Sequence, residues 1–341
     1  MNKKLVTCTG YGATGSSVVT DLLKEFNNVN SLGDFEFTFL STVNGVRDLE
    51  YGLFELNNRS NVDMYIKRFM KEMKYLSGYG FNHYEKWFNG NFEKLSLEFI
   101  DSIVDVEWDG YNMMDIRDES LLVKIMYYSE RVYQKKILKQ NESSATFYTK
   151  VMKKKRYYAC PTSKEEFYKK VQDYIGKLAK NIDCNENHEY IVFDQLVPPT
   201  DIENYLQYVN GLKVIVIDRD PRDLYLLEKH QYREIFIPFQ DVKTFVKWYR
   251  MVRECKSNQE HSQILRLKFE DFIYKYDETI QSVMNFLDLK SEHWLNKQKY
   301  FDPSISIKNT NKIKDYISSE DKNDIAYIEQ ELSEYCYRFN G

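Results

Sequence analysis

The sequence lacks the features that mark a secreted, membrane-spanning or metal-binding protein. Its five cysteines are widely spread and form no Cys-x-x-Cys pair, so reduced thiols are expected. The five histidines show no ligand spacing, which indicates no metal site. The start MNKKLVTCTG has only a short apolar run, and no stretch approaches the roughly 18 apolar residues of a membrane helix. We therefore expect a cytoplasmic protein with no transmembrane segment.

The chain also lacks a strong charge of either sign. A formal net charge of −4 provides no basic field that would attract nucleic acid, so an anionic ligand must be held by local features. Apolar residues at 43% and charged residues at 29% describe a globular protein with a sizeable core. No repeat, proline-rich linker or low-complexity segment divides the 341 residues, which favours one continuous domain over 1–341.

Four short runs of β-type residues indicate the strands of a sheet. The runs YIVFD and KVIVID are continuously apolar, which is typical of strands buried on both faces of a parallel sheet. We therefore predict an α/β fold with a doubly wound parallel sheet flanked by helices. The predicted strands are Lys4 to Thr9, Tyr190 to Asp194, Lys213 to Asp218 and Gln263 to Phe269.

Helical patterns lie between and after these strands. Apolar residues recur at one-face spacing from Val18, directly after the first strand. Thr162 and Glu165 stand in capping-box spacing before another helix, and a final helix is expected from about Ser319. Residues 60–185 contain no convincing buried strand and read as successive amphipathic helices. We interpret this region as a helical insertion, or subdomain, within the single domain.

A glycine-rich turn joins the first strand to the first helix. Glycines allow backbone N–H groups to turn toward one point, and a helix N-terminus favours a phosphate oxyanion. The spacing is that of a P-loop, but Ser16 occupies the position of the lysine in nucleoside-triphosphate binders. A tight turn without a ligand is the alternative. The candidate phosphate-binding residues are Gly10, Tyr11, Gly12, Ala13, Thr14, Gly15, Ser16 and Ser17.

A second motif, Arg-Asp-Pro-Arg-Asp, follows the third predicted strand and precedes an apparent helix. Pro221 suits the first turn of a helix, where its missing N–H has no intrahelical partner to lose. Arg219 and Arg222 at a strand end are suited to clamping a phosphate. The alternative is that both arginines pair with Asp220 and Asp223 in a purely structural role.

Four segments, in order, resemble the sulfotransferase superfamily, and within it bacterial proteins associated with surface-polysaccharide synthesis. They are GYGATGSS, KVIVIDRDPRD, RLKFEDFIYKYDETIQSVMNFLDL and FDPSISIKNTNKIKDY, which together extend from residue 5 to about 316. The resemblance implies an enzyme that transfers a sulfuryl group from 3′-phosphoadenosine 5′-phosphosulfate to an acceptor hydroxyl, expected to belong to a sugar or glycan of a surface polysaccharide. It implies no metal and leaves the oligomeric state unknown.

The resemblance also implies roles for individual residues. The glycine-rich turn would hold the 5′-phosphosulfate, and Arg219 would bind the 3′-phosphate. Leu227 stands where the family usually has a serine, and Ala13 stands where it commonly has a lysine. Another cation must then balance the bridging oxygen. The candidates, which the sequence leaves open, are Lys308, Lys312 and Arg222.

A base is needed to accept the proton of the acceptor hydroxyl. In related carbohydrate sulfotransferases the base resembles a glutamate shortly after the first helix, and GDFEFTF places Glu36 in that region. The small-molecule branch has a histidine some two dozen residues before the arginine motif, and Asp194 lies in that neighbourhood here. Glu36 is therefore the first candidate and Asp194 the second. Either carboxylate could instead serve as a cap or an ion-pair partner.

Two other functions fit parts of the pattern. A P-loop kinase would use Asp218, at the end of VIVID, to bind magnesium, although the missing loop lysine weighs against it. A catalytically degenerate family member that binds a nucleotide or glycan without turnover is the second alternative. Ala13 and Leu227 motivate it, since both depart from the family pattern.

Overall fold

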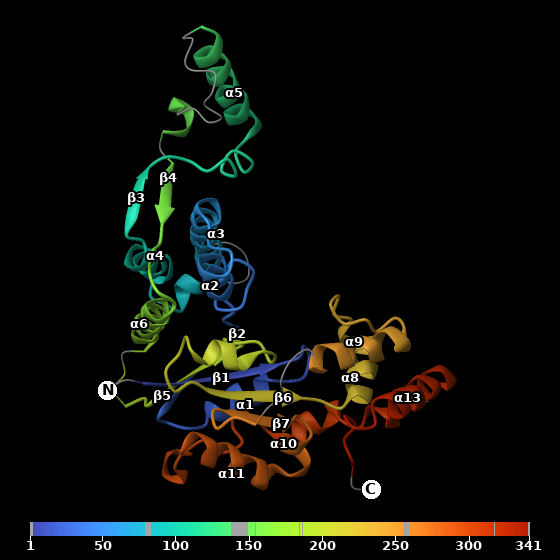
Figure 1. Cartoon of the computed structure of the whole chain (residues 1–341). Coiled ribbons are helices and arrows are strands. Elements are labelled where there is room, and N and C mark those ends of the chain that lie inside the picture. Colours follow the sequence, from blue (N-terminus) through green and yellow to red (C-terminus); the bar gives the residue numbers. More distant parts are fainter. Residues whose placement is uncertain are drawn as a thin grey trace. The chain divides into compact units, whose positions relative to one another are not determined.

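The computed structural model describes residues 3–78, 83–137, 149–153, 155–183, 185, 187–254, 260–316 and 318–339. The chain forms two compact units, one of residues 1–41 and 179–341 and the other of residues 42–178 (Figure 1). The interpretation of residues 60–185 as an insertion within one domain stays a prediction. None of the helices described is long and apolar enough to cross a membrane.

The first unit is built around a five-stranded parallel sheet, which confirms the predicted α/β fold. Its strand order is β2-β5-β1-β6-β7, so all five carboxyl ends lie at one edge. Four of the strands match the predicted runs closely, and the fifth, β2, was not predicted. The strands are β1 (Lys4–Gly10), β2 (Val29–Glu36), β5 (Tyr190–Asp194), β6 (Lys213–Asp218) and β7 (Ile264–Lys268).

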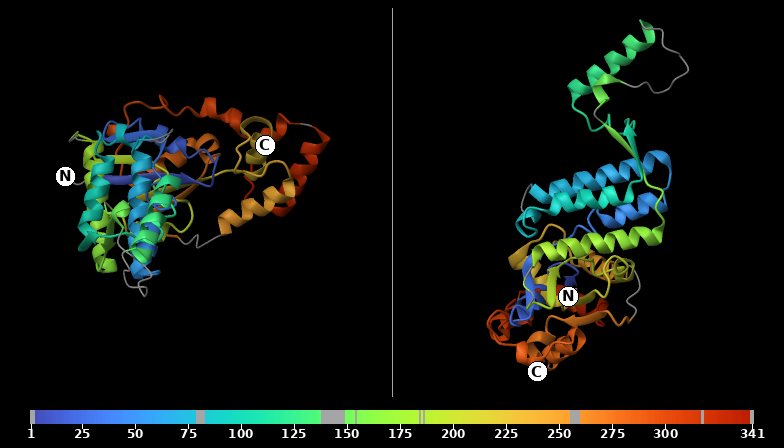
Figure 2. Two further views of the ribbon diagram at one scale, coloured as in Figure 1. Left: turned by 90° about the horizontal axis from the view of Figure 1, so that it is seen from above. Right: turned by 90° about the vertical axis from the view of Figure 1, so that its left-hand side faces the viewer.

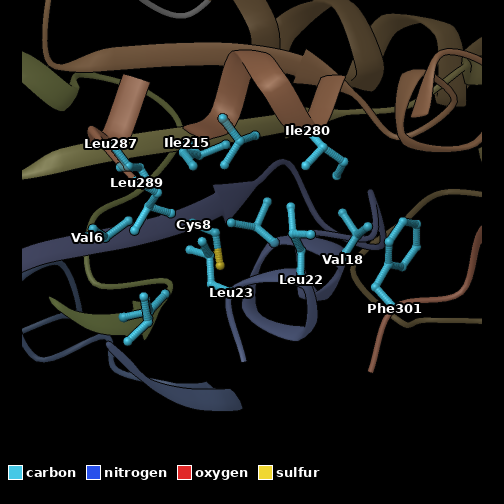
Figure 3. Close-up of a cluster of buried hydrophobic side chains, with 14 of the residues drawn as sticks. Val6, Cys8, Val18, Leu22, Leu23, Ile215, Ile280, Leu287, Leu289 and Phe301 are labelled. Atoms are coloured by element: carbon cyan, nitrogen blue, oxygen red, sulfur yellow. The ribbon is translucent and has the colours of Figure 1, made fainter. Parts of the chain in front are cut away.

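Helices of the first unit pack into two apolar clusters. One cluster joins β1 and β6 to α1 (Ser17–Leu23) and α11 (Tyr276–Leu287), with Cys8 and Leu22 fully buried between them (Figure 3). The other joins helices of the carboxyl-terminal half. It contains α8 (Pro221–Leu227), α9 (Val242–Glu254) and α13 (Ser319–Glu331). The shorter helices of this unit are α7 (Ile202–Leu206), α10 (Asp271–Tyr274) and α12 (Pro303–Ser306).

The second unit consists mainly of helices, most of which run alongside one another (Figure 2). Phe99 is central to their packing, because its ring contacts both Phe69 and Tyr174. A short antiparallel pair, β3 (Val106–Asp109) and β4 (Arg156–Ala159), is also present, with β3 exposed along its whole length. The helices are α2 (Val46–Phe54), α3 (Arg59–Gly78), α4 (Phe92–Ile103), α5 (Leu121–Lys136) and α6 (Lys164–Ile182), the last four residues of which belong to the first unit.

The start of α6 differs by one residue from the predicted capping box. The backbone N–H of Glu166 donates to the Ser163 hydroxyl at 3.2 Å, so Ser163 takes the capping position predicted for Thr162. Of the five cysteines, Cys8, Cys160 and Cys336 are free thiols. Cys184 and Cys255 lie outside the described residues.

Candidate functional site

A cavity of about 450 Å³ lies at the carboxyl edge of the sheet. The glycine-rich turn forms one part of its wall, and the ends of β2 and β5 form another. Glu36 and Asp194, the two candidate bases, therefore line the same cavity as the turn. Its lining includes Gly10, Gly12, Ala13, Thr14, Gly15, Ser16, Ser17, Asp34, Glu36, Asp194, Gln195 and Phe236.

The turn has a backbone that depends on glycine. Gly12 and Gly15 have φ angles of +93° and +82°, in the left-handed region that side chains rarely adopt, and even Ala13 has a φ of +50°. Successive N–H groups in such a turn can form an anion-binding concavity. A Cβ at Gly10 would meet the Thr14 hydroxyl at 2.0 Å, so the turn closes tightly on itself.

Gln195 holds the turn in place and was not predicted as a site residue. Its Nε2 donates to the Ser16 hydroxyl at 3.1 Å, and its Oε1 accepts from the Thr9 hydroxyl at 2.9 Å. The residue directly after β5 is thereby tied to β1 and to the turn. Ser16, which occupies the position of the P-loop lysine, is thus held in place by the neutral side-chain amide of Gln195.

Substitution of Gly15 is expected to disturb the core under the turn. A Cβ at this position would lie 2.7 Å from the ring of Phe269, and the φ of +82° would add backbone strain. We expect Gly15→Ala to lower the free energy of unfolding by about 2–4 kcal/mol, measured by denaturant titration. Gly90→Ala, at a φ of +73° with open space around its Cβ, is the matched control and should cost only about 1 kcal/mol. Equal losses in the two variants would contradict the packing argument.

The two candidate bases have different surroundings. Asp194 is 4% exposed, and its Oδ1 accepts from the Cys8 thiol at 3.1 Å. Burial raises the pKa of Asp194 to about 7, with the charges of Glu36 and Asp34 adding to the rise and the thiol hydrogen bond opposing it. Burial also raises the pKa of Glu36. Glu36 stands opposite Asp194 in the pairing of β2 with β5, which places its charge where it contributes to the raised pKa of Asp194.

The raised pKa of Asp194 predicts a pH-dependent stability. The folded protein holds this proton up to about pH 7, whereas the unfolded chain releases it near its ordinary pKa of 3.8. The free energy of unfolding therefore falls as the pH rises from about 4 to 8. Relative to the parent, Asp194→Asn should gain about 2–4 kcal/mol of stability over this range, as followed by denaturant titrations at several pH values. A difference that stays constant with pH would show that Asp194 titrates normally.

Arg219 lies beneath the turn and does not line the cavity. It is 3% exposed, with Nη1 donating to the Ala13 carbonyl at 3.2 Å and Nη2 donating to the Asn309 carbonyl. Its guanidinium stacks 4.7 Å from the centre of the Phe269 ring. Nε is buried and has no hydrogen-bond partner within the part of the chain described. Arg219 thus links the turn to residue 309 and retains one unused donor.

The other predicted cations do not line the cavity either. Arg222 pairs with Asp220, one of the two partners of the structural alternative, and with Glu329, and its Nη2 also donates to the Tyr337 carbonyl at 2.7 Å. Lys312 is 6% exposed and contacts Asp315. Lys308 is exposed to solvent. Among the described residues that line the cavity there are three carboxylates and neither lysine nor arginine.

The surroundings of Asp218 and Leu227 concern the two alternative functions, a P-loop kinase and a protein that binds a nucleotide or glycan without turnover. Asp218, which a kinase would use for magnesium, is contacted by Nε and Nη2 of Arg253 and so is already paired with a cation. Leu227 is fully buried, and its apolar side chain offers no hydroxyl to a ligand.

Comparisons with known proteins give matches only among solved structures. No family model and no curated protein matches the chain. The sulfotransferase domain of the Synechococcus PCC 7002 olefin synthase is 11% identical, with 98% of this chain and 95% of that chain covered and a TM-score of 0.41. The sulfotransferase domain of the curacin biosynthetic pathway is 12% identical, with 96% and 98% covered and a TM-score of 0.40.

The match to sulfotransferase STF9 from Mycobacterium avium covers 100% of this chain and 79% of that chain, with 9% identity and a TM-score of 0.38. These values are too low to carry an argument about function.

Proposed function

We propose that the chain is a sulfotransferase that uses 3′-phosphoadenosine 5′-phosphosulfate as its donor and a carbohydrate hydroxyl as its acceptor. The proposal rests chiefly on one cavity that joins the glycine-rich turn to the carboxyl groups of Glu36 and Asp194. In open α/β sheets, ligands bind at the carboxyl ends of the strands, which is where this cavity lies.

The donor would be held by the turn and by Arg219. Backbone N–H groups of the turn at Gly12 to Gly15 suit the 5′-phosphosulfate, since the positive φ angles leave a concave backbone and no side chain at two positions. Within the described part of the chain the buried Nε of Arg219 has no hydrogen-bond partner, and a 3′-phosphate would supply a charged acceptor for it. Exchange of the Asn309 carbonyl for the phosphate would free a second donor.

The acceptor side of the reaction needs an oxygen nucleophile in line with the sulfur and the leaving oxygen. Positioning and donors to the leaving oxygens should supply most of the rate, as in phosphoryl transfer. Glu36 is the first candidate for the base and Asp194 the second. Burial raises both pKa values toward neutrality, which suits proton acceptance late in the transfer.

The biological setting follows from the resemblance alone. A sugar of a surface polysaccharide is the proposed acceptor, and the cytoplasm, where an activated nucleotide donor is found, is the proposed compartment. No metal is needed for the transfer. A kinase is disfavoured, because Ser16 replaces the loop lysine and Arg253 already pairs with Asp218.

Calorimetry with two nucleotides tests the proposal. The full chain should bind adenosine 3′,5′-bisphosphate, the product of the donor, and should bind ATP with magnesium much more weakly. Preference for ATP with magnesium would replace the sulfotransferase by a kinase. If the bisphosphate binds but a panel of glycans yields no sulfated product, the degenerate nucleotide-binding alternative is favoured.

A further inference from the structure

A second cavity, of about 540 Å³, lies against β6 and β7 in the first unit. Residues from the end of the described chain, Tyr335 to Arg338, complete its wall. β7 is the outermost strand on its side of the sheet (Figure 1), and Arg266, Leu267 and Lys268 of this strand line the cavity. Among the described residues, five cationic side chains and two carboxylates line it. The cations are Arg253, Arg266, Lys268, Lys275 and Arg338.

The two carboxylates of this cavity are already paired. Asp218 contacts Arg253, which is 2% exposed, and Asp271 lies 3.1 Å from Lys275. Their charges are thus balanced by two of the five cations. An excess of positive charge remains in a chain whose net charge is −4, so this is a local cationic site.

Arg266 and Arg338 supply much of this excess. Neither has a carboxylate within ion-pair distance in the part of the chain that the structure describes. Lys268 differs from them, since its Nζ donates to the Tyr335 carbonyl at 2.8 Å. A guanidinium group offers two parallel N–H donors that match a carboxylate or a sulfate ester. The two arginines are therefore suited to bind an anion.

Tyrosine rings make up the rest of the recognition surface. Tyr11, Tyr335 and Tyr337 line the cavity, and each combines an apolar face with a hydroxyl. Such rings suit the faces and hydroxyls of a sugar. A volume of about 540 Å³ is within the range of small-molecule sites.

Tyr11 connects this cavity to the glycine-rich turn. Its neighbours Gly10 and Gly12 line the 450 Å³ cavity, whereas Tyr11 lines the cationic one, so the two cavities lie on either side of the turn. We infer that the cationic cavity binds an anionic sugar unit, carrying a carboxylate or a sulfate ester, of the glycan whose hydroxyl is modified. Its role as an acceptor subsite rests on the proposed function, whereas the binding of an anionic sugar does not.

Calorimetry with three tetrasaccharides tests the inference on the full chain. Tetragalacturonate supplies carboxylates, sulfated maltotetraose supplies sulfate esters, and maltotetraose is the neutral reference. At least one anionic probe should bind more tightly than maltotetraose, with an affinity that falls as salt is raised. The double variant Arg266→Gln with Arg338→Gln should weaken this binding about tenfold or more.

A matched variant controls for the loss of two positive charges. The double variant Lys290→Gln with Lys322→Gln also removes two positive charges, at exposed positions that line neither cavity. It should leave binding of the anionic sugar unchanged. Equal weakening in both double variants would overturn the inference, because the charge effect would then be nonspecific. Failure of both anionic probes to exceed maltotetraose would overturn it as well.

Binding of adenosine 3′,5′-bisphosphate separates the inference from the proposed function. The arginine double variant should keep the bisphosphate affinity of the parent. If it loses the bisphosphate instead, the cavity holds the nucleotide and the sugar assignment is wrong. If the parent fails to bind the bisphosphate but binds an anionic sugar through the arginines, the proposed function fails while the anionic-sugar site stands.

Discussion

Glu36→Gln is expected to lower the rate of sulfuryl transfer about 100- to 10,000-fold, the usual contribution of a general base. Glutamine has nearly the same shape but cannot accept the acceptor proton. Donor affinity should stay close to that of the parent, because the base acts on the acceptor. Single-turnover transfer to a verified acceptor measures the rate, and calorimetry with adenosine 3′,5′-bisphosphate measures the affinity.

Asp194→Asn is the comparison for this prediction. Both carboxyl groups line the same cavity, but Asp194 is buried and accepts from Cys8, whereas Glu36 is the more exposed of the two. If Glu36→Gln turns over like the parent while Asp194→Asn is inactive, the base is Asp194. If neither change lowers turnover, neither carboxylate takes the proton.

Arg219→Met is expected to weaken binding of adenosine 3′,5′-bisphosphate about 10- to 150-fold, the value of one charge-assisted hydrogen bond of about 1.5–3 kcal/mol. Affinity for adenosine 5′-monophosphate should change much less, since it lacks the 3′-phosphate. The variant should also unfold more easily, because the carbonyls of Ala13 and Asn309 each lose a donor. Methionine keeps an apolar side chain beside Phe269.

The ratio of the two affinities isolates the 3′-phosphate contact from any loss of stability. Arg222→Met serves as a control, since Arg222 is engaged with Asp220 and Glu329. It should lower stability but leave the ratio unchanged. Equal weakening of both nucleotides by Arg219→Met would show that Arg219 supports the turn without reading the 3′-phosphate.

Much of the sheet could be predicted because its central strands are short, apolar and bounded by polar residues. YIVFD and KVIVID correspond residue for residue to β5 and β6. β2 escaped prediction because its sequence, VNSLGDFE, contains a glycine and four polar or charged residues but only three apolar ones. Its strand state depends on pairing with β5, an interaction between residues about 160 positions apart that no local pattern contains.

The sequence by itself determined the glycine-rich turn after β1 and the arginine motif after β6, since both depend on local composition. It also determined the parallel sheet, whose common strand direction places the two motifs at one edge. Only the tertiary structure decided which side chains meet. It placed Gln195 on Ser16, buried Arg219 beneath the turn, and gave Arg222 and Lys312 carboxylate partners of their own. Contacts of this kind depend on long-range packing, which brings distant residues within hydrogen-bonding distance and which the spacing of residues along the chain does not encode.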